Sequence, residues 1–184
     1  MKKQSTFAYM LRLTLTLLLI CSFMAGALAA VNGVTAPIIE RLTWEKTQKA
    51  IEAVLPGGGE AIDVPAVDVG ATVSCVYKGE NGYAIEVVPT GFGGGITMMV
   101  GVDFEGNVLG ISVVSHTETA GLGSVAGDKT SKGEAFRGQF VGQSGQVTVS
   151  KDGGQIDAIT GATITSRAVC DGVNAALAVV ANMG

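Results

Sequence analysis

The most extended pattern in the chain is an apolar run near its N-terminus. Residues 13–31 (LTLTLLLICSFMAGALAAV) contain no charged side chain, and a run of this length can cross the hydrocarbon core of a membrane as a helix. Lys2, Lys3 and Arg12 precede it. Because basic residues tend to stay on the cytoplasmic side, we expect a cytoplasmic N-terminus (1–12), one transmembrane helix (13–31), and the remaining chain outside the cytoplasm.

The same run has a second interpretation. The small residues ALAA at positions 27–30 resemble the cleavage site of a secretory signal peptide. The apolar stretch is longer than the usual signal core, however, and uncharged sequence continues as far as Ile39. These two features favour a retained membrane anchor over a cleaved signal.

Helical spacing continues beyond the apolar run. Apolar residues recur at nearly helical intervals between positions 38 and 54, Thr35 can cap the start of a helix, and Pro56 with the three glycines after it can end one. We therefore expect a linker helix and a connector within residues 32–70.

The pattern then changes to period two and short apolar runs, which are typical of strands. Four segments of this kind are bounded by Gly, Asn, Asp or Pro: TVSCVYK, YAIEVVP, GITMMVGVDF and VLGISVVS. Gly106 and Asn107 lie between the last two and favour a tight hairpin. The pattern predicts antiparallel strands.

The C-terminal segment, TITSRAVCDGVNAALAVVANMG, returns to helical spacing. One face of the expected helix is apolar and contains Val169, Val173, Ala176, Leu177 and Val180. Residues 71–184 are thus expected to form one α+β domain, with an antiparallel sheet and packing helices.

Composition and charge narrow the functional classes. The chain has 184 residues, 27 of them glycine, and a net charge of −4, so no basic field is available to bind nucleic acid. Cys21, Cys75 and Cys170 form no CxxC pair, which argues against a disulfide scaffold or a thiolate metal site. His116 is the single histidine. With Glu118 it suggests acid–base work or a metal pair, but a structural or ligand-orienting role is favoured and no metal site is expected.

The stretch DAITGATITS, residues 157–166, is the strongest candidate for chemistry. Asp157 and Thr160 can accept hydrogen bonds from free N–H groups at a helix start, Gly161 permits a turn or a close ligand, and Thr163 can open the helix. Such a helix terminus suits a phosphate. The residues alone also fit a capping cluster that binds no ligand, and both interpretations stay open on this evidence.

A resemblance to a known family rests on this stretch. DAITGAT follows the pattern D-x-x-(S/T)-G-A-T, in which a flavin transferase joins FMN to the final threonine through a phosphoester bond. The segments VNGVTAPII, VLPGG, GYAIEVVPTGFGGGITMMVGVD and HTETAGLGS also occur in order. Nearly the whole chain resembles the FMN-binding G subunits of Rnf electron-transport complexes. It is also similar to the C subunit of the Na+-pumping NADH:quinone oxidoreductase, which is typically longer. Ala120 departs from the proline that the family has in its ETPGLG loop.

The resemblance implies a set of site residues. Thr163 would be the residue esterified to FMN, and Asp157 would be needed for recognition by the flavin transferase. The phosphate and ribityl chain would be surrounded by Thr160, Gly161, Ala162, Ile164 and Thr165. The flavin would be lined from the other side by Thr117, Glu118, Thr119, Gly121, Leu122 and Gly123. The glycines at 93–95 are also expected to let the cofactor approach the backbone closely, although a simple flexible turn fits these residues equally well.

The resemblance also implies a function. The chain would be a single-pass membrane flavoprotein that carries electrons between other subunits of a redox complex, without substrate chemistry of its own. In Rnf complexes electrons move between ferredoxin and NAD, coupled to ion translocation. Two alternatives stay open: an FMN-binding domain of another membrane redox system, such as the Na+-pumping NADH:quinone oxidoreductase, or an anchored binding module with no redox role.

Overall fold

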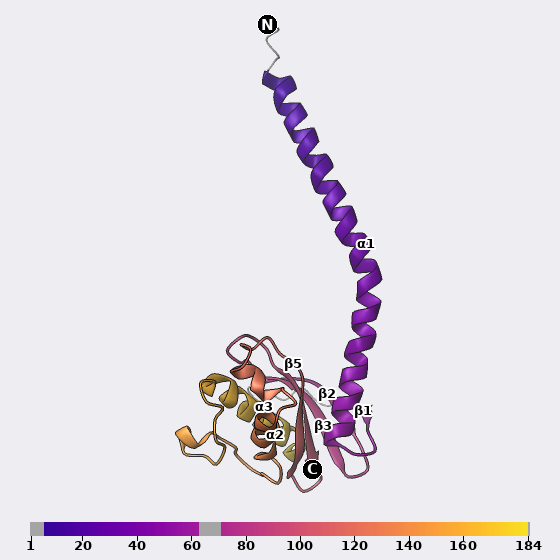
Figure 1. Ribbon diagram of the computed structural model, residues 1–184. Coiled ribbons are helices and arrows are strands. Elements are labelled where there is room, and N and C mark those ends of the chain that lie inside the picture. The colour runs from indigo at the N-terminus through magenta and orange to yellow at the C-terminus, as the bar shows by residue number, and fades with distance from the viewer. Residues whose placement is uncertain (1–5, 63–70, 184) are drawn as a thin grey trace. The chain divides into compact units, whose positions relative to one another are not determined.

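A computed structural model of the chain describes residues 6–62 and 71–183 (Figure 1). The first five residues of the expected cytoplasmic segment, positions 63–70 of the expected connector, and residue 184 lie outside the described residues. The chain divides into two compact units, residues 1–45 and 46–184. The elements, in order, are α1 (Thr6–Val54), β1 (Glu60–Ile62), β2 (Thr72–Lys78), β3 (Gly82–Val88), β4 (Thr97–Asp103), β5 (Val108–Ser115), η1 (Gly123–Ala126), α2 (Ser131–Gly138), η2 (Ser150–Asp152) and α3 (Thr163–Ala181).

Helix α1 confirms the apolar N-terminal helix. Its most apolar stretch has a mean hydropathy of 2.2 and is 0% buried within the structure. The expected cap at Thr35 is wrong, because no second helix begins there and Pro37 lies inside α1. A proline removes one backbone hydrogen bond, which a long helix tolerates. The polar residues that follow Ile39 are rich in Glu, Lys and Gln, which are good helix formers, so the helical backbone continues.

The sheet confirms the four predicted strands, each to within about two residues, which is the usual uncertainty of element ends. All neighbouring strands are antiparallel, in the order β1-β2-β3-β4-β5. The turn between β4 and β5 is also confirmed, with Gly106 at φ 85°. The Asp103 carboxylate stabilises this turn, since its Oδ1 accepts hydrogen bonds from the N–H groups of Glu105 (2.9 Å) and Asn107 (2.7 Å).

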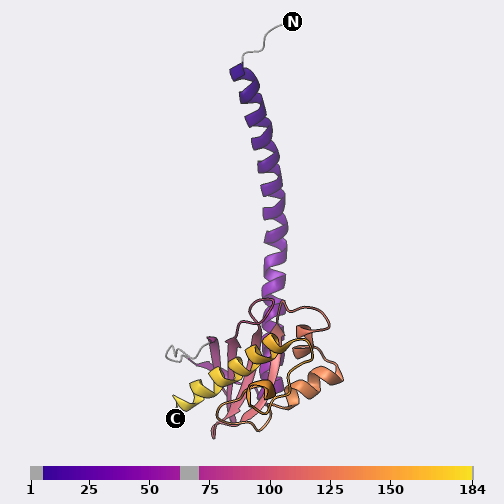
Figure 2. The ribbon, with the colours of Figure 1, turned by 90° about the vertical axis from the view of Figure 1, so that its left-hand side faces the viewer.

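The two faces of the sheet are covered by different helices. Helix α3 packs on β3 and β4 (Figure 2), and all five residues of its predicted apolar face are buried in the core on that side. The opposite face carries Tyr77, Ala84 and Met99. These residues pack against Ile51 in the last turn of α1 and against Leu55, which directly follows the helix. The domain is therefore a three-layer arrangement of helix, sheet and helix, which agrees with the expected α+β class.

Gly101 allows the end of α1 to lie directly on the sheet. It pairs with Ala84 on β3 and Gly110 on β5. A Cβ atom at position 101 would collide with the carbonyl oxygen of Val54, the last residue of α1. The absence of a side chain here thus sets how closely helix and sheet approach.

Helix α2 was not predicted from the sequence. Thr130 caps its start by accepting a hydrogen bond from the N–H of Gly133 at 3.3 Å. Near its end, the Arg137 guanidinium donates to the carbonyl oxygens of Ala126 (2.7 Å) and Asp128 (3.0 Å). These bonds fix the segment from η1 to α2, which continues from the loop at 117–123.

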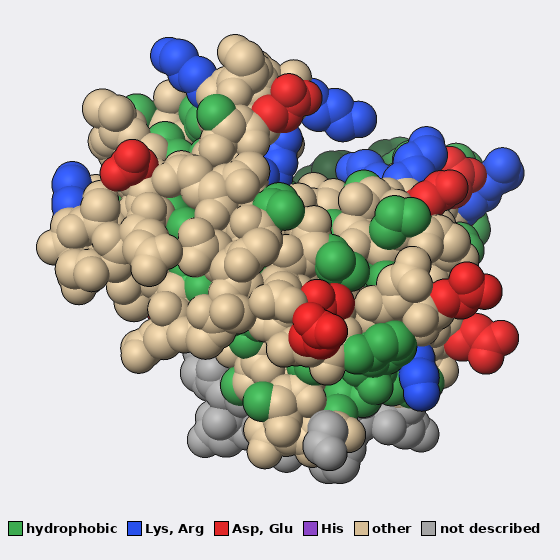
Figure 3. Space-filling model, turned by 90° about the horizontal axis from the view of Figure 1, so that it is seen from below, with side chains coloured by type: hydrophobic (Ala, Val, Ile, Leu, Met, Phe, Trp, Pro, Cys, Tyr) green, Lys and Arg blue, Asp and Glu red, His purple; other side chains and the backbone are tan. Residues whose placement is uncertain are grey.

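The surface carries both signs of charge. On the face shown in Figure 3, basic and acidic side chains are interspersed among polar groups and backbone. This mixture agrees with the small net charge of −4.

Candidate functional site

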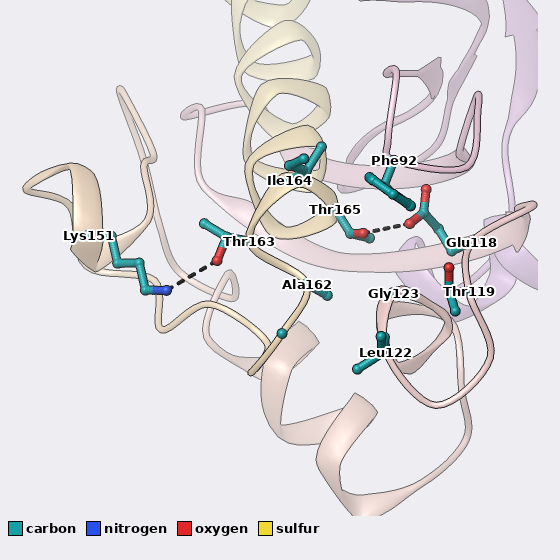
Figure 4. Close-up of a pocket in the computed structure, with 11 residues that line it drawn as sticks. Phe92, Glu118, Thr119, Leu122, Gly123, Lys151, Ala162, Thr163, Ile164 and Thr165 are labelled. Carbon is teal, nitrogen blue, oxygen red and sulfur yellow. Dashed lines mark hydrogen bonds between the residues drawn. The ribbon is translucent and has the colours of Figure 1, made fainter.

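A pocket of about 380 Å³ lies around the start of α3 (Figure 4). Its walls come from four regions: the loop after β3, the loop at 117–123, the short helix η2, and the segment that begins α3. Its size falls in the range of pockets that hold small organic ligands. The lining residues are Phe92, Glu118, Thr119, Leu122, Gly123, Lys151, Gly161, Ala162, Thr163, Ile164 and Thr165.

Thr163 is the first residue of α3, as the sequence predicted. The N-cap position is Ala162, and no side chain forms a capping hydrogen bond there. The expectation that Asp157 and Thr160 cap the helix is therefore wrong. Asp157 is instead held through its backbone, whose N–H donates to Oε1 of Gln139 at 2.7 Å. The positive end of α3 consequently faces the pocket without a side-chain oxygen over it.

The turn before α3 depends on Gly161 and Ser166. Gly161 has φ 79°, a conformation that favours glycine, and a Cβ atom there would lie 3.1 Å from Cδ2 of Leu122. The Ser166 hydroxyl accepts from the N–H of Ile159 (2.9 Å) and donates to the carbonyl of Ala162 (3.0 Å). Buried Ser166 therefore ties the turn to the helix from inside.

Lys151 lies beside the Thr163 hydroxyl. Its ammonium Nζ donates a hydrogen bond to Oγ1 of Thr163 at 3.2 Å. The neighbouring Asp152 pairs with Arg167 through two contacts of 2.7 Å. This hydrogen-bonded pairing with Arg167 lowers the pKa of Asp152 below its usual value. The Thr163 hydroxyl thus lies next to the positive charge of Lys151.

Glu118 connects the other walls of the pocket. Its buried carboxylate accepts hydrogen bonds from the Thr165 hydroxyl (2.6 Å) and the N–H of Gly93 (2.9 Å). The Thr117 hydroxyl donates in turn to the carbonyl of Gly93 at 2.8 Å. One carboxylate therefore joins α3, the loop after β3 and the loop at 117–123.

His116 supports Glu118. Its Nδ1 accepts a hydrogen bond from the Glu118 N–H at 3.3 Å. Its ring packs so closely on Gly127 that a Cβ atom there would lie 3.0 Å from Cδ2. Within residues 6–62 and 71–183, no group of three or more His, Cys, Asp or Glu residues could hold a metal ion. These contacts give His116 a structural role in the loop.

The structure brings most of the sequence-predicted site residues together. Thr163 and eight of the predicted flavin contacts line the pocket: Glu118, Thr119, Leu122, Gly123, Gly161, Ala162, Ile164 and Thr165. Thr117, Thr160 and Gly121 are not among the lining residues. Asp157 also lies outside the lining set.

Two lining residues were missed from the sequence. Phe92 lies between glycines in the segment GFGGG and is 69% exposed. An aromatic side chain in a glycine-rich turn was the available signal. Lys151 lies twelve residues before Thr163 and offers no comparable pattern, since its contact depends on how the loop folds back.

The arrangement suits a phosphorylated ligand with a flat apolar part. Lys151 and Thr163 lie on one side of the start of α3, and Phe92, Glu118 and Leu122 lie on the other (Figure 4). Phe92, Leu122 and Ile164 are apolar side chains of the lining, each at least 44% exposed. The first side can accept a phosphate, and the second can cover a planar ring.

Comparisons with known proteins agree with this geometry. The FMN-binding domain family matches residues 91–178. The G subunit of the Na+-translocating ferredoxin:NAD+ oxidoreductase complex of Acetobacterium woodii is 32% identical, covering 99% of this chain and 97% of that protein. The G subunit of the ion-translocating oxidoreductase complex of Cronobacter sakazakii is 34% identical, covering 88% of this chain and 85% of that protein. The Methanosarcina acetivorans protein of the same name is 32% identical over 90% of this chain and 92% of its own length.

Proposed function

Because this chain belongs to the family of G subunits of ion-translocating oxidoreductase complexes, we propose that it carries one FMN joined through its phosphate to the Thr163 hydroxyl. The chain is a flavoprotein subunit of a multi-subunit complex with an FMN-binding domain. The covalent bond, its position and the chain's orientation in the membrane are the parts that we propose.

The observation that carries the proposal is the setting of Thr163. Its hydroxyl lines the pocket at the first residue of α3, in contact with the Lys151 ammonium. The N–H groups at the start of this helix can donate to phosphate oxygens, and the helix dipole favours negative charge there. A phosphate esterified to Thr163 would meet both groups.

The rest of the pocket fits the remainder of FMN. From Thr163, the ribityl chain would run past Ala162 and Gly161 across the start of α3. The isoalloxazine ring would then meet Phe92 and Leu122, whose apolar side chains exclude water from one face of a ring. FMN supplies one- and two-electron transfer when bound. The protein residues hold the ring and adjust its surroundings.

A location outside the cytoplasm would explain why the cofactor is held by a covalent bond. The apolar helix α1 and the relatives indicate a membrane subunit, and the basic residues before the apolar run favour a domain outside the cytoplasm. A cofactor held only by equilibrium binding dissociates when its free concentration falls below the dissociation constant. We propose that the ester bond removes this dependence where free FMN is scarce.

Within the complex, we propose that the flavin relays electrons between other redox subunits. The Acetobacterium woodii relative belongs to a ferredoxin:NAD+ oxidoreductase that translocates Na+. By analogy, this chain would serve electron flow between ferredoxin and NAD, coupled to ion translocation. It would have no substrate of its own, and its maturation would need a flavin transferase.

Substitution of Thr163 tests the bond directly. The full chain is expressed with a flavin transferase, and flavin fluorescence is measured in the denatured protein band together with the mass of the peptide that contains position 163. The wild-type chain should retain the flavin. Thr163→Val, which removes only the nucleophilic oxygen, should lose it, whereas Thr163→Ser should keep it.

The outcomes separate the candidate functions. Wild-type chain that carries no flavin in the presence of the transferase would favour an anchored binding module without a redox role. Flavin retained by Thr163→Val would place the attachment at another residue.

A further inference from the structure

We propose that Lys151 is the residue that neutralises the phosphate at Thr163, and that the Asp152–Arg167 ion pair holds it in place. The inference rests on the proposed attachment of FMN to Thr163. It assigns a role to the short helix η2 (Ser150–Asp152) and its flanking residues, which precede the DAITGAT motif.

The η2 turn that carries Lys151 is held against α3 by a second contact, between the neighbouring Asp152 and Arg167. Arg167 follows Thr163 by four residues on α3, so the two side chains lie on the same side of the helix. Lys151 donates to Thr163 at 3.2 Å, and the adjacent Asp152 accepts from Arg167 at 2.7 Å. The short η2 turn is thereby joined to the first turns of α3 at two points.

The backbone around η2 is also fixed. Val149 and Ile156, on either side of the turn, are 1% and 0% exposed and form a parallel bridge with each other. Gly153 ends η2 with φ 86°, which lets the chain reverse direction. Exposed Lys151 therefore projects from an anchored turn.

The contact geometry matches the chemistry of attachment. A hydroxyl oxygen has two lone pairs, and the Lys151 N–H occupies only one of them. The other lone pair is free to attack an activated FMN, an anhydride such as a flavin dinucleotide. The bond from Oγ1 to phosphorus forms, the anhydride P–O bond breaks, the nucleoside monophosphate leaves with the electron pair, and the hydroxyl proton passes to the transferase or solvent.

The charges near Thr163 become balanced when this ester forms. Lys151 and Arg167 contribute two positive charges and Asp152 one negative charge, and the phosphodiester adds a second negative charge. Without Lys151, the negative charges of the phosphodiester and of Asp152 would have to share one cation among these residues, Arg167. This shortage of positive charge would apply both during the transfer and in the product.

The test is the rate of FMN attachment to full-length protein in detergent, with purified flavin transferase and flavin adenine dinucleotide. Attachment is followed by intact mass. Lys151→Met should react about three- to ten-fold more slowly, because one charge-assisted contact at an exposed site is lost. Lys151→Arg should stay within about two-fold of wild type, since it keeps the cation. Lys132→Met, which removes an exposed lysine on α2 outside the pocket, should react like wild type.

Two further measurements make the result specific. The thermal unfolding midpoint of unmodified Lys151→Met should equal that of wild type, which excludes a folding defect as the cause. The ratio of wild-type to Lys151→Met rates should fall toward one as NaCl rises, because salt screens exposed charges.

The proposal is overturned if Lys151→Met reacts within a factor of two of wild type, or if Lys151→Arg is slowed as much as Lys151→Met. Failure of the wild-type chain to gain FMN at Thr163 would instead overturn the proposed function, so the two failures are distinguishable.

Discussion

At the scale of single residues, the position of Glu118 depends on two glycines. A Cβ atom at Gly91 would collide with Oε1 of Glu118, and one at Gly123 would collide with Oε2. The carboxylate is thus enclosed on both sides by residues without side chains. This leaves room for its hydrogen bonds to Thr165 and Gly93 and lets it join three walls of the pocket.

Gly123→Ala should disturb this arrangement. The added Cβ would also lie 2.6 Å from Oγ1 of Thr165, so the Thr165–Glu118 hydrogen bond must give way. We expect a loss of about 1–3 kcal/mol in the free energy of unfolding, as for overpacking elsewhere, measured by urea denaturation. Gly138→Ala is the control: nothing lies within 4 Å of that Cβ, so stability should be unchanged or slightly higher. Equal effects of the two substitutions would contradict the steric argument.

Glu118 should also influence the flavin electrostatically. A buried carboxylate repels the negative charge of added electrons, so Glu118→Gln should raise the midpoint potential of the bound FMN, by an amount on the order of tens of millivolts. Spectroelectrochemical titration measures the change. Glu134→Gln, at an exposed position on α2, should leave the potential unaltered. An unchanged or lower potential in Glu118→Gln would refute the prediction.

The sequence predicted those site residues that lie in contiguous motifs. Thr163 and its neighbours belong to the stretch 157–166, and Glu118 and Leu122 belong to the segment HTETAGLGS. Local chemistry and family resemblance therefore identified both groups of residues. The prediction that Asp157 and Thr160 cap α3 was wrong, because composition cannot tell which side-chain oxygen points at the N–H groups of the helix start. Lys151 could not be predicted, since its contact with Thr163 exists only after η2 packs against α3.

At the scale of elements, the end of α1 is a structural part of the domain. Ile51 and Leu55 are 1% and 0% exposed and pack on the sheet face opposite α3. The sheet therefore has both faces covered at its centre. This packing gives the last turns of α1 a role in stability that is separate from membrane anchoring.

Ile51→Ala should reveal this role. Truncating a fully buried isoleucine leaves a cavity and typically costs about 2–5 kcal/mol, so the domain should unfold at lower urea concentration. Glu52→Ala, one residue along α1 and exposed, should have an effect below about 0.5 kcal/mol. A loss of similar size in both variants would argue against the packing described.

The elements that could be predicted are those with a repeated pattern. The sequences of strands β2 to β5 alternate between apolar and polar residues or form short apolar runs, and α3 has an apolar face over about three turns, so periodicity identified these elements. Strand β1 has three residues, too few for a period to show. Helix α2 begins at Ser131 behind a capping threonine and contains two glycines, which lowers its intrinsic helix propensity.

At the scale of the whole molecule, the cysteines can report the orientation that we propose. Cys75 on β2 is exposed and Cys170 on α3 is buried, and burial raises the pKa of the Cys170 thiol to about 12. At neutral pH the reactive thiolate of Cys170 is therefore scarce. Cys21 lies within the apolar run that is expected to be in the membrane.

A membrane-impermeant maleimide should consequently label Cys75 in cells whose inner membrane is intact. If the cells have an outer membrane, it is first made permeable to the reagent. Labelling should disappear in Cys75→Ser and persist in Cys170→Ser, as measured by the mobility shift of the tagged protein. Reaction that requires disruption of the inner membrane would place the domain in the cytoplasm and contradict the proposed orientation.

The burial of Ile51 and Leu55 also determines how much of the N-terminal segment can be removed to obtain a soluble domain. A secreted fragment that begins at Lys46 or earlier keeps every residue of the second compact unit. One that begins after Leu55 leaves Tyr77, Ala84 and Met99 facing water without their partners, and such a surface favours aggregation. Anchor removal for crystallisation or electrochemistry therefore has a boundary some fifteen residues beyond the predicted end of the membrane span, not at the first strand.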